Sequence, residues 1–158
     1  MLTTISLGVS VAARREDLVR WIRMPASRLC FPGARNARGD ARGLHFEVDL
    51  RAPGAAPALV VVDEYLKDQG RARGGLWFET SQVWMWPNRQ AGASWHRYTL
   101  RENGAQTELD FSWRFMLPGL AGAQVANAMR LNRSIERAAE IYLERLAVGA
   151  EENSSALV

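Results

Sequence analysis

The chain has 158 residues, 47% of them hydrophobic and 23% charged, so it can bury a core without disulfides or metal. Its net charge of +3 is spread among interspersed acidic and basic residues, which argues against nucleic-acid binding. Its single cysteine, Cys30, excludes an internal disulfide and indicates a reducing compartment. Since we find neither a signal peptide nor an apolar run of the roughly 20 residues that a membrane span needs, we expect a cytoplasmic protein.

The first part of the chain predicts one strand and two short helices. Residues 4–11 alternate between apolar and small polar side chains, which is the period of a half-buried strand. Residues 14–22 repeat apolar side chains at helical spacing, with acidic residues in the first turn. After Pro25, residues 26–31 predict a second short helix, and residues 33–43 are polar enough to indicate a loop.

The middle of the chain predicts a series of strands joined by short turns. We expect them at residues 44–50, 59–66, 94–101 and 107–116, with two more inside 72–86. Together with the first strand this gives about seven. Because the connections are too short for crossovers, the strands should form an antiparallel meander.

A long amphipathic helix is predicted to follow, ending near Val148 because Gly149 is a typical helix stop. The residues of one helix face repeat at steps of three and four: Ala121, Val125, Ala128, Asn132, Ile135, Ala139, Tyr142 and Leu146. The first half of this face is small or polar, which would leave room above the sheet. We expect a single ligand-binding domain over residues 1–149 and a disordered tail over 150–158.

The order strand, helix pair, antiparallel strands and C-terminal helix resembles the helix-grip superfamily. Its members include START lipid-binding domains, birch-pollen-allergen-type proteins and bacterial polyketide cyclases/dehydratases (SRPBCC-type proteins). The opening TISLGVSVAARREDLVRWI is similar to the first strand and helix of that superfamily, and SWHRYTLRENGAQTELDFSWRF is similar to its final hairpin. The resemblance implies an α+β fold whose curved antiparallel sheet wraps around the long helix and encloses a cavity.

Four polar side chains are candidates for acid/base chemistry in such a cavity. If Leu59 and Val61 point inward, Asp63 and Tyr65 do too, because alternate residues of a strand share a face. On another strand, His96 and Tyr98 share a face. His96 would be the general acid or base, Asp63 would orient it, and Tyr65 and Tyr98 would donate hydrogen bonds to a substrate carbonyl.

A structural role for these side chains stays open. A strand histidine is often part of the hydrogen-bonded framework, and a single bulge would invert its strand. In that case Trp95, Arg97 and Thr99 would face inward instead.

Aromatic and aliphatic side chains are the candidates for contact with a hydrophobic or conjugated ligand. Trp84 and Trp86 share one strand face and could form a wall of the pocket. The full set of predicted ligand-binding residues is Phe46, Val48, Val61, Trp84, Trp86, Phe111, Trp113, Val125, Met129 and Asn132. Which faces of the strands within 72–86 line the cavity is left open.

The sequence contains no phosphate-binding loop, metal-ligand spacing or nucleophile elbow, so we predict no metal and no cofactor. Three functions agree with these patterns. The first is a cofactor-independent polyketide cyclase or dehydratase acting by orientation and acid/base catalysis in biosynthesis. The second is a non-catalytic carrier of a hydrophobic ligand such as a lipid or polyketide. The third is a structural, cochaperone-like domain with a filled core. A homodimer is left open.

Overall fold

The computed structural model describes residues 2–51, 57–116 and 125–156, with side chains described for 4–51, 57–116 and 133–154. Its elements, in chain order, are β1 (Leu2–Val11), α1 (Arg15–Arg23), the 3-10 helix η1 (Pro25–Cys30), β2 (Ala34–Gly39), β3 (Leu44–Leu50), β4 (Ala58–Ala72), β5 (Gly75–Met85), β6 (Ala91–Asn103), β7 (Gln106–Met116) and α2 (Val125–Ala156). Among these residues no helix is long and apolar enough to cross a membrane.

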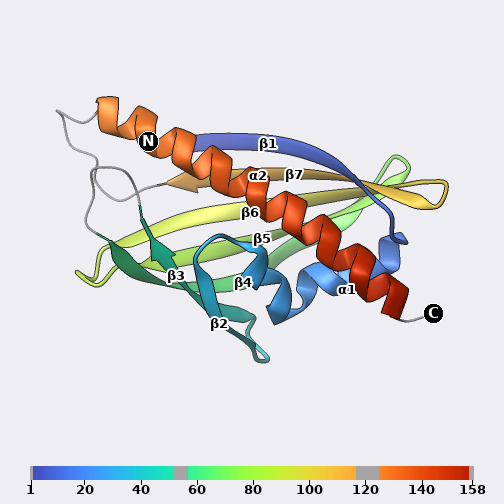
Figure 1. Ribbon diagram of the computed structural model, residues 1–158, viewed down its shortest axis with the longest axis horizontal. Helices are drawn as coiled ribbons and strands as arrows, with labels where there is room; N and C mark the ends of the chain where they lie inside the picture. Colours follow the sequence, from blue (N-terminus) through green and yellow to red (C-terminus); the bar gives the residue numbers. More distant parts are fainter. Residues whose placement is uncertain (1, 52–56, 117–124, 157–158) are drawn as a thin grey trace.

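The seven strands form one antiparallel sheet in the order β1-β7-β6-β5-β4-β3-β2. Figure 1 shows α2 lying diagonally across one face of this sheet, with α1 and η1 beside the C-terminal part of α2. This arrangement confirms the predicted curved sheet, the long C-terminal helix and the two short helices after the first strand. We call the face that α2 covers the inner face and the opposite one the outer face.

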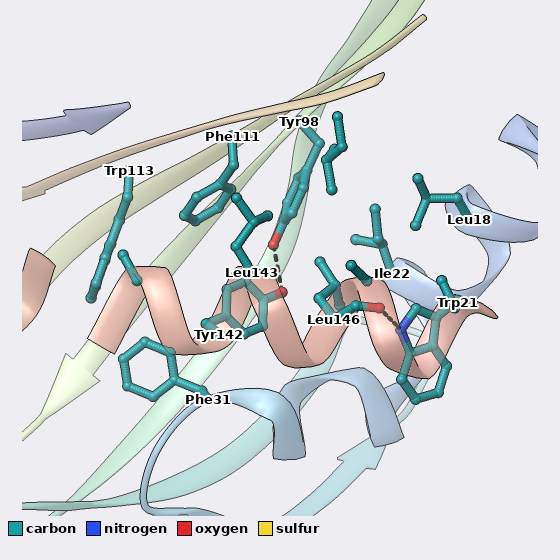
Figure 2. Close-up of a cluster of buried hydrophobic side chains, with 14 of the residues drawn as sticks. Leu18, Trp21, Ile22, Phe31, Tyr98, Phe111, Trp113, Tyr142, Leu143 and Leu146 are labelled. Carbon is teal, nitrogen blue, oxygen red and sulfur yellow. Dashed lines mark hydrogen bonds between the residues drawn. The ribbon is translucent and has the colours of Figure 1, made fainter. Parts of the chain in front are cut away.

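The core lies between the inner face and α2. Strand alternation sends Tyr98, Phe111 and Trp113 inward, where they meet Tyr142 and Leu146 of α2 (Figure 2). All five side chains are buried, and four of them are aromatic. Because these rings are wide, they fill the space over the middle of the sheet and leave room only toward one end.

The strands at residues 58–85 differ from the prediction. Residues 72–86 were expected to hold two strands, but they contain the turn of a single hairpin, in which β4 runs to Ala72 and β5 begins at Gly75. The turn uses Gly74, whose φ of 71° suits glycine. The β4–β5 pairing also shifts between Leu66 and Asp68, so Lys67 marks a bulge. Polar residues beyond Leu66 obscured the continuation of β4.

The predicted loop at residues 33–43 contains the strand β2. It pairs with β3 along the edge of the sheet, with an irregularity between Arg35 and Arg38 where Asn36 has a φ of 54°. Because β2 is an edge strand and most of its side chains are exposed, it needs no apolar face. The seven strands therefore match the predicted number but not the predicted set.

Helix α2 continues through Gly149 to Ala156, beyond its predicted end at Val148 and into the predicted tail. Position 149 requires a glycine because α1 packs closely against α2 at this point. A Cβ on Gly149 would lie 2.5 Å from Cζ2 of Trp21. The indole Nε1 of Trp21 donates a 3.0 Å hydrogen bond to the carbonyl oxygen of Leu146, which fixes the ring (Figure 2). The glycine therefore marks a helix crossing and not a helix end.

We expect Gly149→Ala to destabilise the protein by about 1–3 kcal/mol, because the added methyl group overpacks a ring that is held in place. Alanine is otherwise the better helix former by about 1 kcal/mol, so the sign of the effect is informative. The measurement is urea denaturation followed by circular dichroism. The control is Val148→Ala at the exposed neighbouring position, which should be neutral or slightly stabilising. A more stable Gly149→Ala protein would contradict the close crossing.

Candidate functional site

A cavity of about 560 Å³ lies between the sheet and α2, at the end of the sheet where β3, β5 and β7 finish. Its volume is in the range typical of sites for small molecules. The lining consists mainly of aromatic and aliphatic side chains with a few polar residues: Phe31, Pro32, Gly33, Asp49, Leu50, Arg51, Ala58, Trp84, Trp86, Ala93, Trp113, Phe115, Met116, Ser134, Ile135, Arg137, Ala138 and Ile141.

The titratable side chains of this lining are Asp49, Arg51 and Arg137, and they mark its open side. The two arginine side chains are 76% and 65% exposed. Each has a carboxylate partner, since Arg51 donates to Asp49 at 3.2 Å and Arg137 donates to Glu140 at 2.9 Å. Charge therefore lies at the entrance, while the interior is apolar.

Three aromatic rings close the inner end of the cavity, and we call them the aromatic wall: Phe31, Trp84 and Trp113. Phe31 follows η1 and lies 6.1 Å from the Trp84 ring and 5.6 Å from the Trp113 ring, edge-on to both. The two indoles are stacked, with their centroids 6.2 Å apart and their planes at 25°. These edge-to-face and stacked contacts are the preferred geometries for aromatic pairs, so the wall is well packed.

A buried chain of hydrogen bonds holds one of these indoles in place. Trp84 Nε1 donates to Ser94 Oγ at 2.8 Å, and Ser94 Oγ donates to Gln82 Oε1 at 2.7 Å. Gln82 Nε2 in turn donates to Thr80 Oγ1 at 2.8 Å. Because all four side chains are buried, breaking the chain would leave polar groups unpaired. The orientation of Trp84 toward the cavity is therefore fixed by β5 and β6.

Behind the aromatic wall lies a buried ion pair that the sequence did not reveal. Arg28 of η1 donates to both carboxylate oxygens of Glu64 on β4, at 2.7 and 2.6 Å, and both side chains are at most 2% exposed. Arg28 Nη1 also donates to the Ile22 carbonyl oxygen at 2.9 Å and to Tyr142 Oη at 3.1 Å. Burial alone would raise the pKa of Glu64, but the charge and hydrogen bonds of Arg28 lower it to about 2.

His96 and Tyr98 join this ion pair through Tyr142. The hydroxyl groups of Tyr98 and Tyr142 are 2.9 Å apart, and Tyr98 Oη lies 3.2 Å from His96 Nδ1 (Figure 2 shows the two tyrosines). Arg28 donates to Tyr142 Oη, whereas either hydroxyl can be the donor between Tyr142 and Tyr98, and the direction of the bond between Tyr98 and His96 Nδ1 depends on the tautomer of the imidazole. His96 Nε2 has no hydrogen-bond partner among the described residues.

Burial keeps all three ring side chains of this network neutral. It lowers the pKa of His96 to about 3, raises the pKa of Tyr142 to about 12 and raises the pKa of Tyr98 well above its ordinary value. At neutral pH His96 is therefore an uncharged imidazole already bonded to Tyr98. A general base of ordinary basicity is not available at this position.

The structure brings two of the four predicted catalytic residues together but separates them from the cavity. His96 and Tyr98 point inward as predicted. They do not line the cavity, because His96 lies behind the Trp113 ring with the two centroids 5.5 Å apart. The carboxylate nearest to this network comes from Glu64 and not from Asp63.

The predicted inward face of β4 was wrong. Val60, Val62 and Glu64 are the buried residues of this strand, so Val61, Asp63 and Tyr65 point to the outer face, and Val61 is 45% exposed. The run from Leu59 to Val62 is apolar at every position, so its pattern does not distinguish the two faces. The one available signal was Arg28 in η1, which has no acidic residue close to it in the sequence. If this arginine is buried, it needs a carboxylate from an inward-facing position on a strand.

On the outer face Asp63 belongs to a different cluster. His45 Nδ1 lies 2.6 Å from Asp63 Oδ1, and His45 Nε2 lies 3.0 Å from Asp40 Oδ2. Tyr65 packs edge-on against the His45 ring, with the two centroids 6.3 Å apart. The hydrogen bond to Asp63 and the contact with Asp40 raise the pKa of His45. This cluster ties β3 to β4 and to the turn after β2.

Apart from Val61, which points to the outer face, the predicted ligand-binding residues fall into three groups. Trp84, Trp86 and Trp113 line the cavity. Phe46, Val48 and Phe111 are buried on the inner face but are packed into the core, away from the cavity lining. The side chains of Val125, Met129 and Asn132, on α2, fall outside the described residues.

The sequence missed several residues of the lining, among them Phe31, Phe115 and Ile141. Phe31 directly follows η1, at the end of the predicted second short helix, and nothing in the sequence placed it beside α2. Among the described residues no group of three or more histidine, cysteine or acidic side chains could hold a metal ion.

No protein-family model matches the chain, and no curated protein matches it in sequence. Solved structures are similar to it over nearly their whole length. The Zhui aromatase/cyclase from Streptomyces sp. R1128 has a TM-score of 0.67 and 14% identity, covering 96% of this chain and 94% of that one. A START superfamily protein from Mycobacterium smegmatis has a TM-score of 0.58 and 14% identity, covering 98% and 99%.

An uncharacterized protein from Rhizobium leguminosarum has a TM-score of 0.64 and 18% identity, covering 96% of each chain. At these identities the likeness concerns the fold. The sheet order, the helix pair after β1 and the helix across the inner face agree with it. The protein therefore has the helix-grip fold that the START and aromatase/cyclase structures share.

Proposed function

We propose that this protein binds a flat, hydrophobic small molecule in the cavity between the sheet and α2. The observation that carries the proposal is the apolar interior of about 560 Å³, lined by Trp84, Trp86 and Trp113. Stacked indoles offer broad, rigid surfaces that suit conjugated rings. The arginines at the open side would remain in contact with water and with any polar end of the ligand.

The position of the acid/base groups favours binding without catalysis, which makes a carrier of a lipid or polyketide the better-supported role. His96, Tyr98 and Glu64 lie behind the aromatic wall and are held in the charge states that the network requires. Moving a proton to a bound ligand would require this network to open. A carrier needs the cavity alone.

A polyketide cyclase or dehydratase is the second candidate function. It is favoured by the fold shared with the Zhui aromatase/cyclase and by the aromatic surfaces, which could hold a flexible substrate in a reactive conformation. Orientation alone can contribute much of a rate enhancement. Turnover of a linear polyketone by the purified protein distinguishes this function from simple carriage.

Filling the cavity tests the proposal directly. We expect Ala138→Trp to weaken binding of the aromatic, anionic dye 1-anilinonaphthalene-8-sulfonate by about tenfold or more, since the indole would occupy the space beside Ile135 and Ile141. The measurement is a fluorescence titration of the folded protein. Glu144→Trp, at an exposed position of the same helix, is the control and should bind like the wild type. Equal dye binding by Ala138→Trp and the wild type would exclude this cavity as the site.

A further inference from the structure

A second hollow, of about 270 Å³, lies on the outer face of the sheet over β1, β7 and β6, which are neighbours in the sheet (Figure 1). We call it the outer hollow. A Cβ on Gly8 would lie 3.1 Å from Asp110 Oδ1, so any other residue at this position would take up part of the space. The full lining is Ser6, Leu7, Gly8, Arg97, Thr99, Asp110, Phe111 and Ser112. The sheet separates this hollow from the cavity of the proposed function.

The strand register gathers one cation and three hydroxyl groups in the outer hollow. Arg97 of β6 lies opposite Ser112 of β7, which lies opposite Ser6 of β1. Thr99 follows two residues after Arg97 and therefore shares its face. Directly opposed side chains on a sheet have Cβ atoms about 5 Å apart, so these four side chains are near neighbours. None of the three hydroxyl groups has a hydrogen-bond partner among the described residues.

The guanidinium of Arg97 is held in place by an aromatic ring. Its Cζ lies 4.1 Å from the centroid of Trp77. The indole in turn packs against the backbone of β4, where a Cβ on Gly70 would lie 3.0 Å from three atoms of the ring. Stacking uses the face of a guanidinium and leaves the N–H groups at its edge free to donate. Within the described part of the chain no carboxylate lies at ion-pair distance from Arg97, so these donors lack an acceptor.

The charges around Arg97 favour an anion. Glu79 lies opposite Arg97 in the sheet, but it already accepts from Lys67 at 2.9 Å and from Arg114 at 3.3 Å. Three cations therefore share one carboxylate, which leaves two positive charges uncompensated. The acidic residue of the lining does not cancel this surplus, because Arg101 is paired with it at 2.5 Å.

The donors of the outer hollow suit a tetrahedral oxyanion. They come from three adjacent strands, so they can reach an anion from more than one side, and a phosphate group presents acceptor oxygens in several directions. A carboxylate presents only two oxygens, in one plane. The edge of a guanidinium also matches two phosphate oxygens in a bidentate contact. We propose that the outer hollow is a binding site for a phosphate group, held by Arg97 together with the hydroxyl groups of Ser6, Thr99 and Ser112.

Titration with inorganic phosphate at constant ionic strength, followed by ¹H–¹⁵N correlation spectra, tests this site. Because Arg97 is exposed, we expect saturable binding with a dissociation constant of about 1 mM. The amides that shift should cluster on β1, β6 and β7 around the outer hollow. Acetate should bind more weakly, since it has fewer acceptor positions. Shifts that do not saturate or do not cluster there, or acetate binding as tightly as phosphate, would overturn the proposal.

Two variants separate a specific site from general attraction to a basic protein. Arg97→Gln should raise the dissociation constant about tenfold or more, because it removes the charged donor. Ser112→Ala should raise it about threefold without changing the charge. Arg20→Gln, at a 65% exposed position of α1, removes the same charge elsewhere and is the matched control. The spectra themselves check that each variant is folded. Equal weakening by Arg97→Gln and Arg20→Gln would contradict a site at Arg97.

A further comparison identifies the source of the phosphate group. Phenyl phosphate represents a soluble phosphate ester, and vesicles of phosphatidylcholine with phosphatidic acid represent a lipid headgroup. Binding of phenyl phosphate without cosedimentation with the vesicles assigns the site to a soluble ligand. Cosedimentation that is lost in Arg97→Gln assigns it to a membrane lipid. Binding of neither probe by the folded wild type would overturn the proposal.

Discussion

Replacing Arg28 with methionine is expected to lower the free energy of unfolding by about 3–5 kcal/mol, because it leaves the carboxylate of Glu64 buried without its partner. The two side chains are joined by two hydrogen bonds and are at most 2% exposed. Arg28 also donates to the carbonyl oxygen of Ile22 and to Tyr142, so the substitution removes partners from three elements at once. Guanidinium denaturation followed by tryptophan fluorescence measures the change.

The double variant Arg28→Met, Glu64→Leu separates the cost of an unpaired charge from the value of the pair. Burying two charges is expensive, so replacing both with apolar side chains of similar size is often neutral or stabilising. We therefore expect the double variant to recover most of the stability lost in Arg28→Met. If the double variant is as unstable as the single one, the ion pair contributes through its contacts with Ile22 and Tyr142 and not through compensation of Glu64.

The second large effect is on the acid dependence of stability. His96 has a folded-state pKa of about 3 against an ordinary value of 6.5, so between these limits the unfolded chain binds a proton that the folded protein does not. Stability therefore falls as the pH falls through this range, by about 1.4 kcal/mol for each pH unit. Glu64 adds to the loss only below its ordinary value of 4.5, since its folded pKa is about 2. Between pH 6 and pH 5, the change in the free energy of unfolding therefore reports on His96 and not on Glu64.

His96→Phe is expected to remove this acid slope. The phenyl ring keeps the packing against Phe111 and Trp113 but cannot bind a proton, so its free energy of unfolding should change less between pH 6 and pH 5 than that of the wild type. The loss of the hydrogen bond between His96 and Tyr98 lowers stability equally at both pH values and does not affect the comparison. Urea denaturation at the two pH values gives the slopes.

His45→Asn provides the control of opposite sign. The pKa of His45 is raised by its carboxylate neighbours, so its contribution is complete below pH 6.5 and is lost as the pH rises through the folded-state pKa. His45→Asn should therefore keep the acid slope and lose stability mainly at low and neutral pH. An unchanged acid slope in His96→Phe would show that His96 is protonated in the folded protein.

The fold could be predicted because its strands alternate cleanly where one face meets α2. Residues 107–116 place threonine, leucine and aromatic side chains inward at every second position, and the structure keeps that register throughout β7. The spacing of three and four residues equally predicted the buried face of α2 at Ala139, Tyr142 and Leu146, and all three residues are buried. Such patterns depend on local sequence alone, so no knowledge of the partner element is needed.

The site could be predicted only in part, because its decisive features depend on contacts between distant segments. The apolar run in β4 does not indicate which face is buried, and the choice was settled by Arg28, which lies 36 residues before Glu64. Phe31 and Arg28 lie in or next to the short helix η1, which is too short for its sequence to show which side chains face the sheet. Trp113 belongs to β7, whose alternation is clear, and it lines the cavity. Trp84 and Trp86 line it as well, although the sequence left open which faces of residues 72–86 point toward the cavity.

The pairing of β1 with β7 has a consequence for synthesis of the chain on the ribosome. Strand β1 is made first, but its neighbour in the sheet is the last strand to be made, and their register joins Leu2 to Met116. Hairpins from β2 to β7 can pair as soon as each has emerged, whereas β1 must wait with Ile5, Leu7 and Val9 uncovered. Exposed apolar surface and unpaired strand edges make a folding chain prone to aggregation. The sheet can therefore be completed only after translation has passed its final strand.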